Sequence, residues 1–240
     1  MSDFYTAVIV PAAGAGKRMG GGTAKQFLPL LGLPVLAHTL RLLQSAPELD
    51  VIVVATLTDH MDEVTDLALA HGIPKLVAVV AGGEHRQDSV FAGLQALRGM
   101  LVPHPLRDRC IVAVHDAARP LLPLMQLSGI LRAAREYPAL VMAVPVKDTI
   151  KIADAAGNVL QTPPRQTAWA AQTPQVFALD LLWEAHRQAA DLGYYGTDDA
   201  ELVERSGQVV RIYPGSEENL KLTTPVDWVL AEAILRGRER

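Results

Sequence analysis

The segment from residue 11 to residue 27 combines small residues with two cationic side chains, Arg18 and Lys25. Glycine and alanine let backbone N–H groups approach phosphate oxygens closely, and the two cations add positive charge around the same anion. The segment directly follows the apolar run Thr6–Ala13, and open α/β sheets bind ligands at the carboxyl ends of their strands. This arrangement predicts a phosphate-binding loop for a nucleotide, with a solvated glycine-rich turn as the alternative.

The spacing excludes two common phosphate-binding loops. A P-loop would need a glycine five positions before Gly16, where Pro11 stands, and a serine or threonine at position 18. A dinucleotide fingerprint starting at Gly14 would need a third glycine at Met19 and an acidic residue about 20 positions further on. Residues 34–37 contain no acidic residue, so a nicotinamide-dependent oxidoreductase is disfavoured.

Composition narrows the class of protein. The chain has 240 residues, of which 50% are hydrophobic, enough for one large α/β domain with a buried core. The net charge of −4 gives no overall basic field for nucleic acid, so an anionic ligand must be bound by local cations and backbone amides. The single cysteine, Cys110, lies in an apolar run, which predicts a buried thiol in a reducing compartment. We expect a cytoplasmic protein without a signal peptide or membrane span.

Apolar runs alternate with helical patterns along the first 146 residues. The runs are short, rich in valine and isoleucine, and apolar throughout, as in parallel strands that are covered on both faces. Predicted strands are Thr6–Ala13, Val51–Thr56, Leu76–Ala81, Cys110–His115 and Val141–Val146. Predicted helices are Pro34–Ser45, Met61–His71, Asp88–Leu97 and Pro123–Tyr137. This order predicts an α/β fold with a Rossmann-like, doubly wound, mostly parallel sheet.

The pattern changes after Val146. Thr149–Ala153 alternates polar and apolar residues, residues 155–158 form a turn signal, and Val159–Thr162 can return as the second strand. An isolated two-stranded hairpin is marginally stable, so residues 147–166 are predicted to be a protruding β-hairpin arm that packs on a second subunit. The alternative is an extension that lies on its own domain.

Later elements complete one domain over residues 1–240, and we expect no further domain. Gln175–Phe177 and Val209–Tyr213 are predicted strands, and Leu179–Leu192 is a predicted helix. Another helix covers Asp198–Ser206, with Thr197 as its expected cap. The last helix is expected to begin at Thr224-Pro225, where Asp227 completes a capping-box-like pattern.

From Val8 to Ala231 the chain resembles the cytidylyltransferases that act on 2-C-methyl-D-erythritol 4-phosphate in the non-mevalonate isoprenoid route. No single motif distinguishes this family from others, but the set of motifs together does. The motifs are Pro11–Gly16 with Arg18, Met19, Lys25 and Gln26; Gly82-Gly83 with Arg86, Asp88 and Ser89; Val114–Pro120; Pro145–Thr149; Thr173–Gln175; Thr197-Asp198; and Asn219–Lys221. Ala24 departs from the family, in which proline is frequent before the lysine.

The resemblance implies transfer of CMP from CTP to the methylerythritol phosphate with Mg²⁺, in a homodimer whose arms complete the partner's site. The nucleophile would be a phosphate oxygen that is already anionic, so positioning and charge neutralisation would carry catalysis. Implied catalytic residues are Arg18, Lys25 and Lys221. Implied nucleotide-binding residues are Ala12, Ala13, Gly14, Gly83, Glu84 and Ser89. Implied substrate-binding residues are Asp116, Arg119, Thr149 and Arg165, with Asp116 also the candidate Mg²⁺ ligand.

Several interpretations stay open at this point. Asp116 could instead cap the next turn, and Arg119, Arg165 and Lys221 could be solvated surface charges. His115 is expected to be buried and satisfied rather than part of a catalytic dyad with Asp116, because neighbouring strand residues point to opposite faces. The alternatives at the level of function are a ribitol-5-phosphate cytidylyltransferase and a non-catalytic nucleotide-binding regulator.

Overall fold

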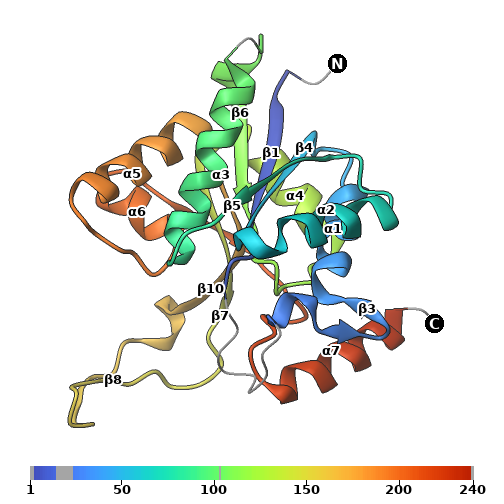
Figure 1. The fold of residues 1–240 in the computed structure, drawn as a ribbon. Helices are drawn as coiled ribbons and strands as arrows, with labels where there is room; N and C mark the ends of the chain where they lie inside the picture. The colour runs from blue at the N-terminus through green and yellow to red at the C-terminus, as the bar shows by residue number, and fades with distance from the viewer. Residues whose placement is uncertain (1–2, 15–23, 103, 239–240) are drawn as a thin grey trace.

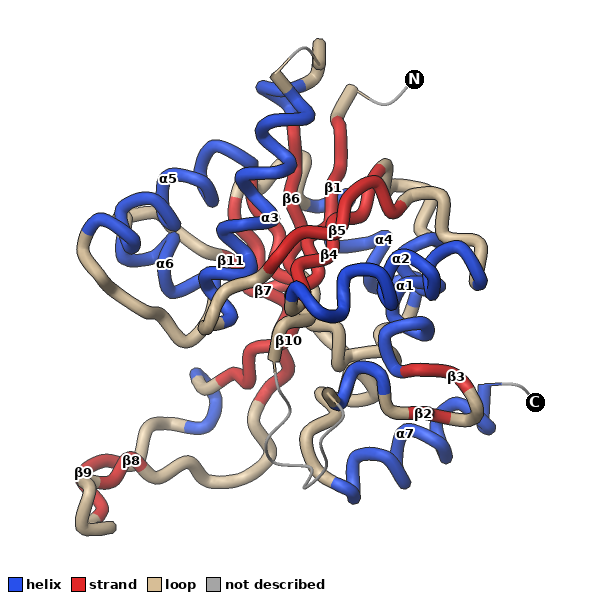
Figure 2. Tube along the Cα trace, viewed as in Figure 1, coloured by secondary structure: helices blue, strands red, loops and turns tan. Residues whose placement is uncertain are grey.

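The computed structural model describes residues 3–14, 24–102 and 104–238. Its centre is a seven-stranded sheet with the order β11-β7-β10-β6-β1-β4-β5 (Figures 1 and 2). The strands are β1 (Tyr5–Pro11), β4 (Val51–Thr56), β5 (Leu76–Ala81), β6 (Cys110–Val114), β7 (Ala139–Pro145), β10 (Trp169–Ala178) and β11 (Arg211–Pro214). The predicted α/β fold with a mostly parallel sheet is confirmed.

Helices cover both faces of this sheet. Alternate residues of β1 point to opposite sides, Val8 and Val10 into one core and Ala7 and Ile9 into the other. One core is closed by α1 (Val35–Ser45), α2 (Met61–Ala70) and α4 (Leu124–Ala133). The other is closed by α3 (Arg86–Leu101), α5 (Leu179–Asp191) and α6 (Asp199–Arg205). Burial on both faces explains why the central strands are apolar throughout.

Strand β10 is longer than the predicted Gln175–Phe177 and, within the described residues, is the one strand antiparallel to its neighbours β6 and β7. Residues 146–168 join β7 to β10 without a crossover helix across the sheet, and a strand that returns beside its predecessor in this way must be antiparallel. The hairpin arm is the extension of this β7–β10 pair.

The arm ends in β8 (Ile152–Ala153) and β9 (Val159–Gln161), close to the predicted strands, and it projects from the body (Figure 1). Asp154 closes its turn by accepting hydrogen bonds from the backbone N–H groups of Ala156 and Asn158, and Gly157 adopts φ +86°. All residues from 147 to 162 are exposed in the single chain. The arm therefore has a large surface available for a partner.

A small outer layer lies at the lower right of the molecule in Figure 1. Helix α7 (Pro225–Arg238) packs on the hairpin of β2 (Pro29–Leu30) and β3 (Leu33–Pro34) through an apolar cluster that includes Leu222 and Ala231. The carboxylate of Asp227 accepts hydrogen bonds from the N–H groups of Thr223 and Thr224, which confirms the predicted helix start. Short 3-10 helices are η2 (Lys25–Phe27), η3 (Thr58–His60), η4 (Arg107–Arg109) and η5 (Arg165–Thr167).

The predicted cap of α6 was wrong by one residue. Asp198 is the N-cap, and its carboxylate accepts a hydrogen bond from the N–H of Glu201 at 2.8 Å. Thr197 instead donates through its N–H and its hydroxyl to the Glu201 carboxylate. In the described part of the chain, no helix is long and apolar enough to cross a membrane.

Candidate active site

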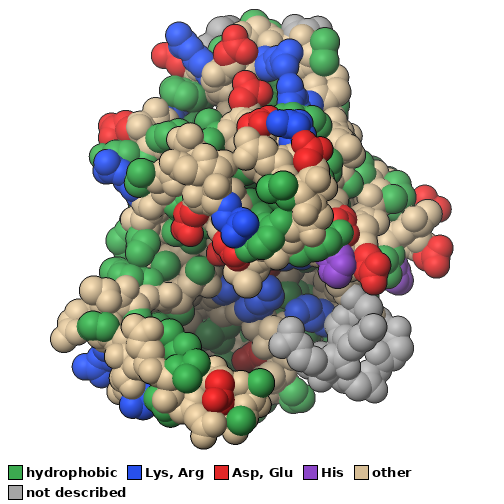
Figure 3. Space-filling view, turned by 90° about the vertical axis from the view of Figure 1, so that its left-hand side faces the viewer, with side chains coloured by type: hydrophobic (Ala, Val, Ile, Leu, Met, Phe, Trp, Pro, Cys, Tyr) green, Lys and Arg blue, Asp and Glu red, His purple; other side chains and the backbone are tan. Residues whose placement is uncertain are grey.

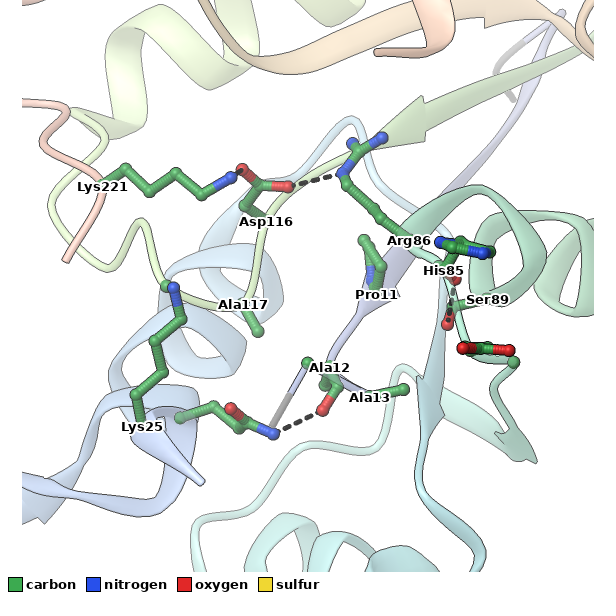
Figure 4. A pocket seen from close by; sticks show the side chains of 15 residues that line it. Pro11, Ala12, Ala13, Lys25, His85, Arg86, Ser89, Asp116, Ala117 and Lys221 are labelled. Carbon is green, nitrogen blue, oxygen red and sulfur yellow. Dashed lines mark hydrogen bonds and ion pairs between the residues drawn. The ribbon is translucent and has the colours of Figure 1, made fainter. Parts of the chain in front are cut away.

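A cleft opens at the carboxyl ends of β1, β5 and β6, where the chain leaves the sheet in three loops. Figure 3 shows it as a hollow in the surface in which Lys and Arg side chains gather. Figure 4 shows Lys25 and Lys221 on one side of the pocket and Arg86 on the other. The lining residues are Pro11, Ala12, Ala13, Gly14, Lys25, Gln26, Gly83, Glu84, His85, Arg86, Ser89, Asp116, Ala117, Ala118 and Lys221.

The six residues predicted to bind the nucleotide all line this pocket. Ala12, Ala13 and Gly14 follow β1, while Gly83 and Glu84 follow β5 and Ser89 lies in the first turn of α3. The two walls meet tightly at Gly82, where an added Cβ would lie 2.7 Å from Ala13 Cβ and 2.7 Å from Ser89 Oγ. Only glycine at this position allows the β5 loop to approach the β1 loop so closely.

Lys25 begins η2, which lies beside the start of β1's loop. The next residue, Gln26, is buried and donates a hydrogen bond through Nε2 to the Ala12 carbonyl oxygen at 2.5 Å. This bond ties the lysine-bearing turn to the loop after β1, so the two halves of the predicted phosphate-binding segment stay together. Arg18, the other predicted cation of this segment, lies outside the described residues.

Three cations surround Asp116 at the floor of the cleft. Arg86 Nε lies 3.0 Å from Oδ1, while Lys221 Nζ lies 2.7 Å and Arg119 Nε 3.7 Å from Oδ2. Burial alone would raise the pKa of Asp116, but the charges of Arg86 and Lys221 outweigh it and hold the pKa well below its usual range. Asp116 is therefore an anion over the whole physiological pH range.

Arg86 is held from a second side. Its Nη1 donates to Asp199 Oδ2 at 2.7 Å, and the buried His186 lies 3.0 Å from Asp199 Oδ1 through Nε2. Burial would lower the pKa of Arg86, but Asp199 and Asp116 together raise it above its ordinary value. A guanidinium bound by two buried carboxylates is a fixed cation.

His115 is buried and satisfied, as predicted, and forms no dyad with Asp116. Its Nε2 lies 3.0 Å from the Arg119 carbonyl oxygen, and its Nδ1 lies 3.2 Å from Thr173 Oγ1. A neutral ring with the proton on Nε2 fits both contacts, since Thr173 can then donate to Nδ1 while it accepts from the Asp116 N–H. Burial lowers the pKa of His115 to about 4.

A second hollow adjoins the first across Asp116. The two share Arg86, Asp116 and Lys221, which line both. The predicted substrate residue Arg119 lies here, and its Nη1 donates to the Asn219 carbonyl oxygen at 2.7 Å. The remaining lining residues are Ala171, Gln172, Thr173, Gln175, Thr197 and Asp198.

The other two predicted substrate residues do not lie in either hollow of this chain. Thr149 and Arg165 stand at the base of the arm and are exposed, and Arg165 Nη1 donates to the Lys147 carbonyl oxygen at 3.1 Å. Neither residue therefore lines the cleft of its own chain.

The sequence analysis assigned no function to Arg86, Gln26 or Thr173, although each belongs to a motif quoted above. The contacts that reveal them join distant segments: Arg86 reaches Asp199 across 113 positions and Asp116 across 30. Spacing within a motif carries no information on such pairs.

A metal ion would find few protein ligands here. Among the described residues, no group of three or more His, Cys, Asp or Glu side chains converges on one point. Asp116 is the acidic side chain that borders both hollows. One carboxylate together with phosphate oxygens of a bound nucleotide is a donor set that suits Mg²⁺.

Comparisons with known proteins agree with this geometry. Residues 6–237 match the family described as IspD, 2-C-methyl-D-erythritol 4-phosphate cytidylyltransferase. A protein of that name from Symbiobacterium thermophilum is 54% identical over 97% of this chain and 94% of its own length. The crystal structure of 4-diphosphocytidyl-2C-methyl-D-erythritol synthase from Anaerococcus prevotii matches with a TM-score of 0.82 and 27% identity, covering 98% and 97% of the two chains. The Thermus thermophilus cytidylyltransferase structure has a TM-score of 0.74, with 32% identity over 97% of this chain and all (100%) of its own.

Proposed function

The chain belongs to the 2-C-methyl-D-erythritol 4-phosphate cytidylyltransferase family, and we propose that its cleft divides into a CTP site and an acceptor site joined at Asp116. The enzyme transfers the cytidylyl group of CTP to 2-C-methyl-D-erythritol 4-phosphate in the isoprenoid pathway named for that substrate. The observation that supports the division is the pair of adjoining hollows that share Arg86, Asp116 and Lys221.

CTP occupies the hollow between the loops after β1 and β5. Its phosphates lie toward Lys25 and Lys221. Arg18, which belongs to the same glycine-rich segment as Lys25, is a further cation. Ala12, Ala13, Gly14, Gly83, Glu84 and Ser89 surround the nucleoside. The tight contact of the two loops at Gly82 leaves a narrow space, which suits a pyrimidine and backbone polar groups.

The acceptor occupies the second hollow, where Arg119 and the exposed hydroxyl of Thr197 are available to its phosphate and hydroxyls. An acceptor phosphate oxygen attacks the α-phosphorus of CTP; a new P–O bond forms, and the bond to pyrophosphate breaks. The nucleophile is already an anion, so no side chain need take a proton from it. The obstacle is repulsion between two phosphate groups, and Lys25, Lys221 and Arg18 reduce it.

Mg²⁺ would be held by Asp116 as its protein ligand and by phosphate oxygens of CTP, with Lys221 displaced from Asp116 Oδ2. When bound, the metal supplies further neutralisation of phosphate charge. Asp116 itself is kept ionised by its neighbours and also fixes Lys221, so its loss would disturb both functions.

The active enzyme is a homodimer in which the arm completes the partner's site. The support is that Thr149 and Arg165 lie outside their own cleft, on an arm whose residues 147–162 are all exposed. A stable monomer with full activity in analytical ultracentrifugation and parallel assays would overturn this part. A cytoplasmic location stays an expectation from the sequence.

The assignment of the cations is tested by pyrophosphate release from CTP and 2-C-methyl-D-erythritol 4-phosphate. Lys25→Met and Lys221→Met keep the apolar stem and remove the charge, so we expect kcat to fall by about 10²-fold or more. Lys75→Met is the matched control, because Lys75 directly precedes β5 and so lies at the amino end of that strand, whereas the cleft lies at its carboxyl end. Wild-type kcat in Lys25→Met would refute the proposed phosphate contact. Pyrophosphate release with ribitol 5-phosphate, measured in parallel, tests which acceptor the enzyme uses.

A further inference from the structure

Lys221 is carried by a segment without regular structure, between β11 and α7. A lysine has a long flexible stem, so the position of its ammonium group depends on how firmly its backbone is held. The segment passes close to β7 at Gly215, whose N–H donates to the Ala143 carbonyl oxygen at 2.8 Å. An added Cβ on Gly215 would lie 2.6 Å from Gln172 Oε1, so the approach to the sheet is tight.

Asn219 is the buried anchor of this segment, with no exposed surface. Its Nδ2 donates to the Thr173 carbonyl oxygen at 2.8 Å and to Gln172 Oε1 at 3.1 Å, which joins the segment to β10. Its own carbonyl oxygen accepts from Arg119 Nη1 at 2.7 Å. One residue thus contacts the strand that supports Asp116, and it also holds one of the cations beside Asp116.

These contacts determine where Lys221 lies. Thr173 Oγ1 accepts from the Asp116 N–H at 3.0 Å, so Asn219 and Asp116 are fixed to the same residue of β10. Lys221 follows Asn219 by two positions, and the next N–H, of Leu222, donates to the Ala118 carbonyl oxygen at 2.9 Å. The backbone of Lys221 is therefore held on both sides, with its Nζ 2.7 Å from Asp116 Oδ2.

We infer that Asn219 is a positioning residue for the transfer reaction. It keeps Lys221 and Arg119 at their places beside Asp116. The inference rests on the catalytic role proposed for Lys221. Asn219 touches neither hollow in the described structure, so its effect must pass through the residues that it holds. A displacement of a catalytic group by about 1 Å can cost about 10²-fold in rate.

The test is a double-mutant cycle on kcat with Asn219→Ala and Lys221→Met. We expect Asn219→Ala alone to lower kcat about tenfold or more, with KM for CTP changed much less. In the Lys221→Met background the same substitution should lower kcat by a smaller factor than it does alone, because the part of its effect that passes through Lys221 is then absent and only the part through Arg119 remains. Thermal unfolding of each variant shows how much stability is lost, and Asn219→Ser replaces Asn219→Ala in the cycle if the alanine variant does not fold.

Gln126→Ala is the matched control. Gln126 lies in α4 and also holds the segment, because its Nε2 donates to the Gly215 carbonyl oxygen, but Gly215 lies six residues before Lys221. It should keep kcat within about twofold of the wild type. Equal losses from Asn219→Ala in both backgrounds, or an equal loss from Gln126→Ala, would overturn the inference and leave the role of Lys221 intact. Wild-type kcat in Lys221→Met would overturn that role and the inference together.

Discussion

The buried histidine beside Asp116 makes the stability of the fold depend on pH in a defined way. His115 accepts from Thr173 at Nδ1 only while it is neutral. A second proton on Nδ1 would remove the acceptor of the Thr173 hydroxyl proton, and it would add a charge with no access to solvent. Burial lowers the pKa of this ring from an ordinary 6.5 to about 4 in the folded state.

Because the pKa of His115 is lower in the folded state, acid pH destabilises the fold. As pH falls from 6.5 to 4, the unfolded chain takes up a proton on His115 that the folded protein does not, so folding becomes less favourable. The stabilisation is fully present above pH 6.5 and is lost as pH falls toward 4. With these two pKa values, linkage gives a loss of about 2 kcal/mol between pH 7 and pH 5 and about 3 kcal/mol in total.

Urea unfolding at pH 7, 6 and 5, at one protein concentration, measures this loss. His115→Gln is the comparison, because glutamine has no proton to gain and its amide can still donate to the Arg119 carbonyl oxygen. The free energy of unfolding should fall between pH 7 and pH 5 by about 2 kcal/mol more in the wild type than in the variant. Parallel pH profiles for the two proteins would refute the neutral, satisfied histidine.

Three further outcomes are expected. Gly82→Ala should raise KM for CTP about tenfold or more in initial-rate assays, because the new methyl group would push Ala13 and Ser89 apart in the nucleotide site. Cys110 should react with a thiol reagent only when the protein unfolds, because burial raises its pKa to about 12; rapid labelling of the native protein by Ellman's reagent would contradict this. Asp198→Ala should lower the free energy of unfolding by about 1 kcal/mol in urea titrations, because α6 loses its N-cap.

The core of the fold could be predicted from the sequence because burial on two faces leaves a simple pattern. The strands around Val53 and Val112 are apolar throughout, and the helices between them have one apolar stripe. The direction of β10 could not be predicted from Gln175–Phe177, since an apolar strand has the same composition in either direction. Its direction follows from the arm, which returns the chain beside β7.

The candidate site was predicted best where it is local in sequence. Small residues directly after a strand predicted the loops at residues 12–14 and 83–89, and both loops contribute residues to the cleft. The cap of α6 was assigned to Thr197 because threonine and aspartate are both good caps and adjacent, so composition alone could not separate them. Asn219 gave no chemical signal, since its function lies in contacts 46 and 47 positions away.

The arrangement around Asp116 also indicates which cation can move. Arg86 is fixed by two carboxylates, and Arg119 is held by the Asn219 carbonyl oxygen and is only 11% exposed in its side chain. Lys221 has 39% of its side chain exposed and borders both hollows. When phosphate groups enter the cleft, turning Lys221 toward them leaves Asp116 still paired with two arginines. Moving Arg86 would instead take the guanidinium away from the buried carboxylate of Asp199, which it contacts at 2.7 Å. Lys221 is therefore the group that can follow the charge as it develops in the transfer reaction, while the arginines keep the carboxylate in place.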